Sequence, residues 1–276
     1  VHVNYDIAED TKLRVSLTSG VSRPTYNELR ASANVDPINL EIDGGNPDLD
    51  AEYAWGFDTS LEWYFADASI FSVGAFGRYV DNVIYPDTTV IADGSTFAPG
   101  VIAAGTPTTV NSFFNGENGE LYGVEANFIG QATFLPGALD GFGLTANVTL
   151  LDSSFEAPTQ GGATYSLPGT SDIIMNGSVF YEKFGLSARV NYQYRDAWLS
   201  TTENDSLTEF WDATERVDAS VRYTVPQDIN GVTFTLFANG NNLTDERDRR
   251  YVGSPRTPNQ YEGFGRRYVV GLRADY

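Results

Sequence analysis

The feature that most constrains this chain is a period of two in its hydrophobic residues. In the closing segment, one set of alternate residues is apolar and the other is largely polar: Tyr268, Val270, Leu272, Ala274 and Tyr276 against Arg267, Val269, Gly271, Arg273 and Asp275. Alternate side chains of a β-strand point to opposite faces. The segment is therefore predicted to be a strand with one apolar and one polar face.

The same alternation recurs along the whole chain. It predicts eleven strands, at residues 1-7, 12-19, 52-65, 69-80, 120-134, 142-155, 171-181, 186-199, 215-225, 232-242 and 266-276. Every one of them has a polar face, which excludes a doubly covered parallel sheet. The expected fold class is all-β and antiparallel.

The lengths of the connections alternate as well. Short links follow the first, third, fifth, seventh and ninth strands, whereas the long connections span about 20-51, 81-119, 156-170, 200-214 and 243-265. Long loops therefore gather at one end of the sheet. Short periplasmic turns and long extracellular loops are typical of a transmembrane β-barrel.

Charge decides which face meets lipid in such a barrel. An Arg at the bilayer midplane costs about 2 to 4 kcal/mol, so the charged set is predicted to face a hydrated lumen or a domain that fills it. The lumen-facing candidates are Arg78, Glu125, Arg189, Arg195, Arg216, Asp218, Arg222, Arg267 and Arg273. The aromatic residues near strand ends suit the two membrane interfaces: Trp63, Tyr79, Tyr181, Tyr223 and Tyr276.

Composition excludes several kinds of chemistry. The chain has no Cys and one His, His2, which leaves no zinc site of Cys and His ligands, no His-assisted hydrolase and no catalytic residue to nominate. A net charge of -20 argues against nucleic acid as a partner. The sequence has no run of eighteen apolar residues and suggests no cofactor. Asp48, Asp50 and Glu52 raise the question of calcium, although a solvated acidic loop is the simpler interpretation.

Binding is instead expected in the long loops. Aromatic residues there stand beside amides, carboxylates and an arginine, a mixture that suits sugar rings and their hydroxyls. The ligand-binding candidates are Tyr85, Phe113, Phe114, Asn115, Trp198, Phe210, Trp211, Arg256, Asn259 and Tyr261. Glu203, Asp205 and Glu209 are the nearby carboxylates. The alternative is that these aromatic residues only pack the loops or the membrane interface.

Five stretches occur in the order and spacing of a known family: "RPTYNEL", "GGNPDLDAEYAWGFDTSLEWYF", "YGVEANF", "NNLTDERDRRYV" and "GLRADY". Together they resemble the C-terminal barrel half of TonB-dependent outer-membrane receptors of Gram-negative bacteria. Asn46, Pro47, Leu49 and Glu52 match the family's "GNP-L-PE" element, with Asp50 where proline is usual. Residues 242-245 match its "NLTD" element, and Tyr276 stands where the family has the aromatic residue read by the barrel-assembly machinery.

The resemblance implies active, TonB-dependent uptake of a scarce nutrient rather than catalysis. It implies that residues 1-276 form the C-terminal portion of a multi-pass barrel of about 22 strands, without the N-terminal plug that binds ligand and is pulled by the TonB complex. The expected partners are outer-membrane lipid, the missing N-terminal barrel half, the plug and a small-molecule or glycan ligand. Acid-rich loops favour a neutral oligosaccharide over an anionic ferric siderophore.

Two other interpretations stay open at this point. One is a passive porin-like or purely structural outer-membrane barrel without energy coupling. The other is a soluble β-sandwich adhesin. An odd number of antiparallel strands cannot close on itself, and an open edge in lipid leaves backbone groups unpaired. The first and last strands are therefore expected to pair with another segment or with a second chain.

Overall fold

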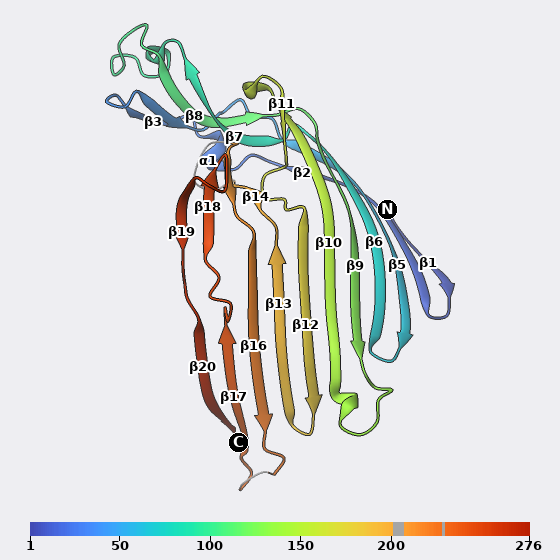
Figure 1. The fold of residues 1–276 in the computed structure, drawn as a ribbon. Helices are drawn as coiled ribbons and strands as arrows, with labels where there is room; N and C mark the ends of the chain where they lie inside the picture. Colours follow the sequence, from blue (N-terminus) through green and yellow to red (C-terminus); the bar gives the residue numbers. More distant parts are fainter. Residues whose placement is uncertain (201–206, 228–229) are drawn as a thin grey trace.

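The computed structural model describes residues 1-200, 207-227 and 230-276. Its main element is one curved antiparallel sheet, the wall, in which each strand pairs with the next of the series (Figure 1). The eleven strands of the wall are β1 (His2–Ala8), β2 (Thr11–Ser22), β5 (Glu52–Ala66), β6 (Ser69–Asp81), β9 (Gly119–Gln131), β10 (Phe142–Ala157), β12 (Ile173–Lys183), β13 (Leu186–Arg195), β16 (Thr214–Thr224), β17 (Thr233–Asn241) and β20 (Arg267–Asp275). They correspond one to one to the eleven predicted strands, so the antiparallel all-β prediction is confirmed.

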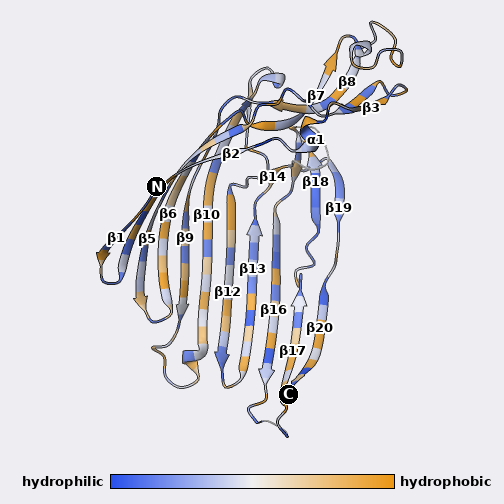
Figure 2. Ribbon diagram, turned by 180° about the vertical axis from the view of Figure 1, so that it is seen from behind, coloured by the Kyte–Doolittle hydropathy of each residue, from blue (hydrophilic) through white to orange (hydrophobic). Residues whose placement is uncertain are grey.

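The pairing register gives the wall two chemically distinct faces. Residues paired across an antiparallel sheet point to the same side, and Val190, for example, pairs with Val179 and Ala219. On the opposite side, Asn191 pairs with Ser178 and Asp218. We call these sides the apolar face and the polar face. Figure 2 shows the alternation of hydrophobic and hydrophilic residues along the strands.

Charge is confined to the two ends of the apolar face. Near the long loops, Asp81, Glu120, Asp152 and Glu215 lie on this face, and Lys183 lies near the short turns. In the described strands, the apolar-face residues between these ends carry no ionised group. A band free of charge, flanked by charged ends, is the pattern of a surface made for hydrocarbon.

Aromatic rings mark both borders of this uncharged band. Trp63, Tyr181 and Tyr223 lie on the apolar face near the short turns, and Tyr79 lies there near the long loops. Tyr276 follows the last strand and is fully exposed. The first four positions agree with two interfacial girdles.

Short turns close the wall at one end, which we call the turn end. Two residues with positive φ, Phe184 and Gly185, connect β12 to β13. This is the conformation that a two-residue hairpin of the type I′ class requires. The connection from β9 to β10 is longer and contains η2 (Leu139–Gly141). No helix in the described part of the chain has the length and apolar character needed to cross a membrane.

The opposite end, the loop end, is far more structured than the sequence predicted. Two additional four-stranded sheets form there from the long connections. The first, loop sheet A, consists of β3 (Ala33–Asp36), β4 (Glu41–Gly44), β8 (Thr108–Asn115) and β7 (Ile84–Ile91). The second, loop sheet B, consists of β14 (Trp198–Leu199), β15 (Glu209–Trp211), β18 (Asp248–Val252) and β19 (Pro258–Glu262). The predicted strand 186-199 is thus divided, because the wall strand ends at Arg195.

Short elements fill the remaining connections at this end. A helical turn, α1 (Tyr26–Leu29), follows β2, and the side chain of Thr25 and that of Glu28 cap it reciprocally. β11 (Ala163–Tyr165) pairs with the last residues of β10, after the turn η3 (Pro158–Gln160). η1 (Gly94–Thr96) lies between the two long strands of loop sheet A.

The largest buried apolar cluster joins several loops to one another. Its buried members come from the regions after β6, at the end of β10, at β14 and before β15: Val83, Tyr85, Phe155, Ala157, Leu199 and Leu207. A second cluster of Ile42, Ala98, Ile102 and Val110 stabilises loop sheet A. The loop end therefore has its own hydrophobic core, separate from the exposed apolar face of the wall.

Candidate binding surface

All nine residues predicted to face the lumen lie on the polar face of the wall. Arg78 pairs in register with Gly56 and Leu121, and its Nη2 donates to Asp58 Oδ1 at 2.7 Å. Glu125 lies on the same side, opposite Gly74. The remaining seven follow by register on β13, β16 and β20: Arg189, Arg195, Arg216, Asp218, Arg222, Arg267 and Arg273. The predicted charges thus share one face from β6 to the last strand.

Several of these charges are held by neighbours instead of pointing freely away. Arg216 forms an ion pair with Asp248 of loop sheet B, and Asp218 Oδ1 accepts from the backbone N–H of Asn242 at 2.7 Å. Arg273 donates to Asp275 at 2.8 Å. Such pairing lowers the free-energy cost of placing charged side chains close together on the polar face. It also fixes the position of each charged group.

Arg195 links the wall to the loops. Its Nε donates to Ser171 Oγ at 2.9 Å and its Nη2 donates to the carbonyl oxygen of Gly169 at 2.6 Å. The guanidinium carbon also lies 4.4 Å from the ring centroid of Trp198. These contacts use the planar, forked shape of arginine, which lysine lacks.

A row of carboxamides crosses the middle of the polar face. Asn176 Nδ2 donates to Asn147 Oδ1 at 2.8 Å, and Asn147 Nδ2 donates to Asn127 Oδ1 at 3.2 Å. Asn127 in turn lies opposite Ser72, and Gln193 lies opposite Asn176. This row was not predicted from the sequence, because only ionised residues were assigned to the lumen. Aligning the predicted strands in register would have found it, since all five residues lie at one level.

Loop sheet B brings together residues that lie in two different predicted loops. Trp198 of β14 pairs with Trp211 of β15, and their rings stack with centroids 5.9 Å apart at 20°. Arg195 covers Trp198, and Arg250 lies with its guanidinium carbon 4.0 Å from the centroid of Trp211. The result is an Arg–Trp–Trp–Arg stack. Cation–π contact of this kind stabilises the sheet, and both indole rings are partly buried in it.

The other face of loop sheet B packs on the loop core. Leu199 is buried there, and Phe210 packs against the same cluster while stacking on Tyr251 at 5.4 Å and 14°. Burial raises the pKa of the Tyr251 phenol above its ordinary value. Phe210 therefore has a structural position in the interior, so it is left out of the proposed binding surface.

Three predicted binding residues remain accessible on the hairpin of β18 and β19. Tyr261 is 61% exposed, Arg256 lies in the exposed turn, and Asn259 donates from Nδ2 to Glu209 Oε1 at 2.8 Å. Nearby, hydrogen bonding to Asp212 raises the pKa of the Arg249 guanidinium and holds the strand in place. This hairpin therefore presents an aromatic ring, an amide and a cation close together in the chain.

The four predicted binding residues in loop sheet A mainly pack in the loop core or form hydrogen bonds between loops. Tyr85 is fully buried, its hydroxyl shares a hydrogen bond of 2.7 Å with Thr159, and burial raises the pKa of its phenol. Phe114 packs against the same core. Asn115 donates from Nδ2 to the carbonyl oxygens of Asp50 and Asn82. Phe113 is partly buried, and its carbonyl oxygen accepts from Asn46.

The two sequence elements used for the family resemblance act as ties between loops. Asn46 donates to the Phe113 carbonyl at 3.0 Å, and Glu52 Oε1 accepts from the backbone N–H of Ile84 at 2.9 Å. Asn242 has a positive φ of 53°, its Oδ1 accepts from Glu246 N–H, and its Nδ2 donates to the Glu246 and Gly265 carbonyl oxygens. These motifs therefore fix the places where a wall strand meets a loop.

The remaining chemical candidates are placed as follows. His2 lies on the polar face opposite Ser16. Among the described residues, no group of three or more His, Cys, Asp or Glu side chains is arranged to hold a metal ion. Glu203 and Asp205 lie outside the described residues. Glu209 is buried beneath loop sheet B.

The structure is an antiparallel sheet with one charged and one uncharged face, with short turns at one end and long loops at the other. These features define the wall of a transmembrane β-barrel. The family model "TonB dependent receptor-like, beta-barrel" matches residues 1–243. The chain belongs to this family, whose members are transporters of the outer membrane and not enzymes.

Solved structures agree in fold. A mutant of the ferric enterobactin receptor PfeA of Pseudomonas aeruginosa is 15% identical, with a TM-score of 0.66 over 99% of this chain and 39% of that chain. The copper transporter OprC is 16% identical, with a TM-score of 0.64 over 98% of this chain and 38% of that one. The siderophore receptor PirA of Acinetobacter baumannii is 15% identical, with a TM-score of 0.60 over 98% and 40%. The chain thus spans about two fifths of these receptors. Among curated proteins, none matches the sequence.

Proposed function

We propose that this chain forms the C-terminal portion of the barrel of a TonB-dependent receptor in the outer membrane of a Gram-negative bacterium. The apolar face contacts lipid, and the polar face lines the lumen and contacts the plug. The plug and the remaining strands belong to other segments of the receptor, which pair with β1 and β20. The observation that carries the proposal is the uncharged band of the apolar face, set against a polar face that holds the nine predicted charged residues, partners such as Asp58 and Asp275, and an amide row.

The receptor takes up a scarce nutrient with energy from the TonB complex. The ligand that we favour is a neutral oligosaccharide. The long connections 81-119, 156-170 and 200-214 contain acidic residues and no Lys or Arg, so they repel an anionic ligand. Tyr261 and Asn259 supply an exposed ring and an amide for a sugar, and the amide row of the polar face offers further hydrogen-bonding groups on the way through the lumen.

A ferric siderophore is the second candidate. Two observations support it: the exposed guanidinium of Arg256 in the β18–β19 turn, and the siderophores in the names of similar solved receptors. The two ligand classes differ in charge. They therefore depend on different residues of the same hairpin.

Binding to the purified full-length receptor separates the two ligands. Isothermal titration with neutral plant-derived oligosaccharides and with ferric enterobactin is compared for the wild type, Tyr261→Ala and Arg256→Gln. Loss of a stacking ring costs about 1 kcal/mol, or about fivefold in affinity. For a sugar we expect the loss with Tyr261→Ala only, and for a siderophore the larger loss with Arg256→Gln. Tyr26→Ala, at a tyrosine of α1 that is even more exposed than Tyr261, is the matched control.

Energy coupling separates active uptake from a passive barrel. Uptake of labelled ligand by cells is measured with and without the TonB protein. Uptake that continues without TonB identifies a porin-like barrel and contradicts the proposal. A receptor that stays soluble without detergent identifies the adhesin alternative.

A further inference from the structure

A groove opens in the apolar face close to the loop end, centred on Gly77 of β6. Gly77 pairs with Phe57 of β5 and Tyr122 of β9, so all three lie on the apolar face. A Cβ atom added at Gly77 would meet no atom within 4 Å. The missing side chain therefore leaves a gap between two aromatic rings.

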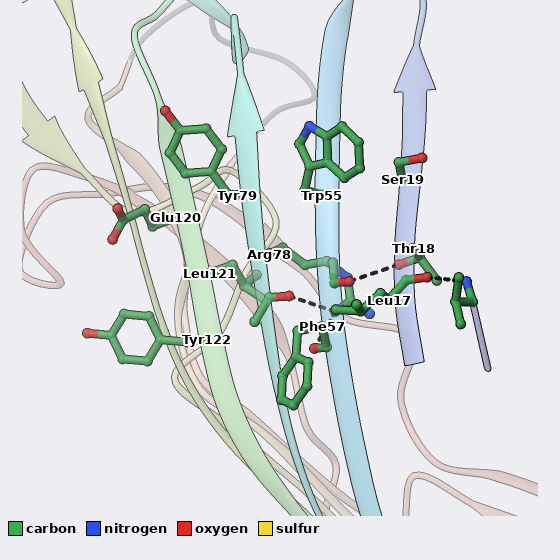
Figure 3. A pocket seen from close by; sticks show the side chains of 13 residues that line it. Leu17, Thr18, Ser19, Trp55, Phe57, Arg78, Tyr79, Glu120, Leu121 and Tyr122 are labelled. Carbon is green, nitrogen blue, oxygen red and sulfur yellow. Dashed lines mark hydrogen bonds between the residues drawn. The ribbon is translucent and has the colours of Figure 1, made fainter. Parts of the chain in front are cut away.

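Four aromatic side chains surround this gap. Figure 3 shows the rings of Trp55, Tyr79, Phe57 and Tyr122. By register, Phe57 and Tyr122 flank Gly77, and Trp55 and Tyr79 lie one row closer to the loop end. The groove has a volume of about 950 Å³ and is lined mainly by apolar surface. Its rings are accessible, as is the rest of the apolar face: Trp55 is 63% exposed and Tyr122 is 54% exposed. Covering rings of this size with an apolar group is favourable.

The groove borders the hydrocarbon band on one side and polar groups on the other. Toward the turn end, the next outward-facing row contains Thr59 paired with Ala75, and this row carries no charge. Toward the loop end, Glu120 lies opposite Tyr79, and Tyr122 donates from its hydroxyl to Asp152 at 2.9 Å. An apolar groove with a polar rim on the side of the loops has the polarity of a single lipid molecule.

We propose that this groove binds an acyl chain of an outer-leaflet lipid. The inference rests on the proposed function in one respect, since it requires the apolar face to lie in the membrane. The groove is continuous with that face and lies at its outer border, where the chains of outer-leaflet lipids begin. A protein partner is disfavoured because the groove lies on the face that we assign to lipid.

Two glycine substitutions provide a matched test. Gly177 of β12 lies on the same face, between Ala146 and Tyr192, and a Cβ atom there would also meet nothing within 4 Å. Gly77→Leu fills the groove, whereas Gly177→Leu adds the same side chain to the apolar face elsewhere. Neither glycine has a positive φ, so leucine fits both backbones.

The full-length receptor is purified in detergent from outer membranes, and retained lipid is counted by native mass spectrometry. We expect one retained lipid in the wild type and in Gly177→Leu, and loss of that species in Gly77→Leu. Equal retention by all three proteins, or no retained lipid in the wild type, would overturn the proposal.

A second measurement distinguishes failure of the groove from failure of the proposed function. The receptor is reconstituted in phosphatidylcholine vesicles brominated on the acyl chains, which quench nearby tryptophan. The signals of Trp55 and Trp63 are obtained as differences from Trp55→Phe and Trp63→Phe. We expect Gly77→Leu to reduce quenching of Trp55 and to leave that of Trp63 unchanged. If Gly77→Leu changes neither, the groove is not a lipid site, and if neither tryptophan is quenched at all, the apolar face does not contact lipid.

Discussion

A single arginine placed on the apolar face tests the orientation of the wall most directly. Val190 lies in the middle of β13, is 51% exposed, and pairs with Val179 and Ala219. It is four residues above Leu186 at the turn end. At about 3.3 Å per residue and a strand tilt of about 40°, this places it roughly 10 Å deep in an apolar band about 25 Å tall.

The expected cost follows from that depth. Arg at the midplane costs about 2 to 4 kcal/mol, and each 1.4 kcal/mol is about a factor of ten, so Val190→Arg should lower the folding equilibrium constant by about 30-fold to 1,000-fold. The neighbouring Asn191 points to the polar face, opposite Ser178 and Asp218. Asn191→Arg adds the same charge without exposing it to lipid, so it serves as the control.

The free energy of unfolding is measured by urea titration of the full-length receptor folded in phosphatidylcholine vesicles, with SDS-resistant mobility as a second signal. We expect Val190→Arg to be the more destabilising by more than about 1 kcal/mol, which is the upper end of the range for an arginine near the interfaces. Equal costs for the two variants, or a larger cost for Asn191→Arg, would show that the assignment of faces is wrong.

Three further predictions concern the loop end. Tyr85→Ala should destabilise the loop core by about 3 to 5 kcal/mol because it leaves a cavity, and this should appear as faster protease cleavage of the loops. Tyr85→Phe loses only the hydrogen bond to Thr159 and should cost about 1 kcal/mol. Similar cleavage of both variants would contradict this prediction. Asn242→Ala should cost about 2 kcal/mol, because alanine is strained at positive φ and loses the bonds to Glu246 and Gly265. Asn242→Gly, measured by the same urea titration, should recover part of the loss, and a glycine variant no better than alanine would refute the role of φ. Arg195→Lys should lower the free energy of unfolding by about 2 kcal/mol, since lysine cannot contact Ser171, Gly169 and Trp198 together. Backbone hydrogen exchange in loop sheet B should become faster. Unchanged exchange at residues 209-211 would count against this prediction.

The wall could be predicted from the sequence because its physics is local in each strand. Alternation of apolar and charged residues determines the faces of a strand without knowledge of its neighbours. Arg267 and Arg273 lie on one side of the last strand because of their spacing alone, and the pairing in the structure places them opposite Asn241 and Thr235. Turn positions were also readable, since the connection Phe184–Gly185 leaves little room for any structure but a tight hairpin.

The loop sheets could not be predicted because their pairings join distant segments. β4 pairs with β8 in parallel, about 70 residues further along the chain, and β15 pairs with β18 across a whole wall hairpin. Six of the eight described strands of these sheets are only two to five residues long, too short for alternation to be recognised. For the same reason, the candidate loop residues included Phe210 and Tyr85, whose aromatic character suits a binding surface and a buried core equally well.

The shared core of the loop end affects how a ligand can act on this structure. Val83 follows β6, Phe155 lies near the end of β10 and Leu199 lies in β14, and all three are buried in one cluster. Burying a side chain of this size is worth about 1.5 to 3 kcal/mol, so moving one loop alone would expose its share of the core at that cost. Arg195 and the Arg216–Asp248 ion pair also tie this end to the polar face of the wall. We therefore expect a ligand that shifts the β18–β19 hairpin to move the rest of loop sheet B with it, because the Arg216–Asp248 ion pair connects that sheet to the polar face.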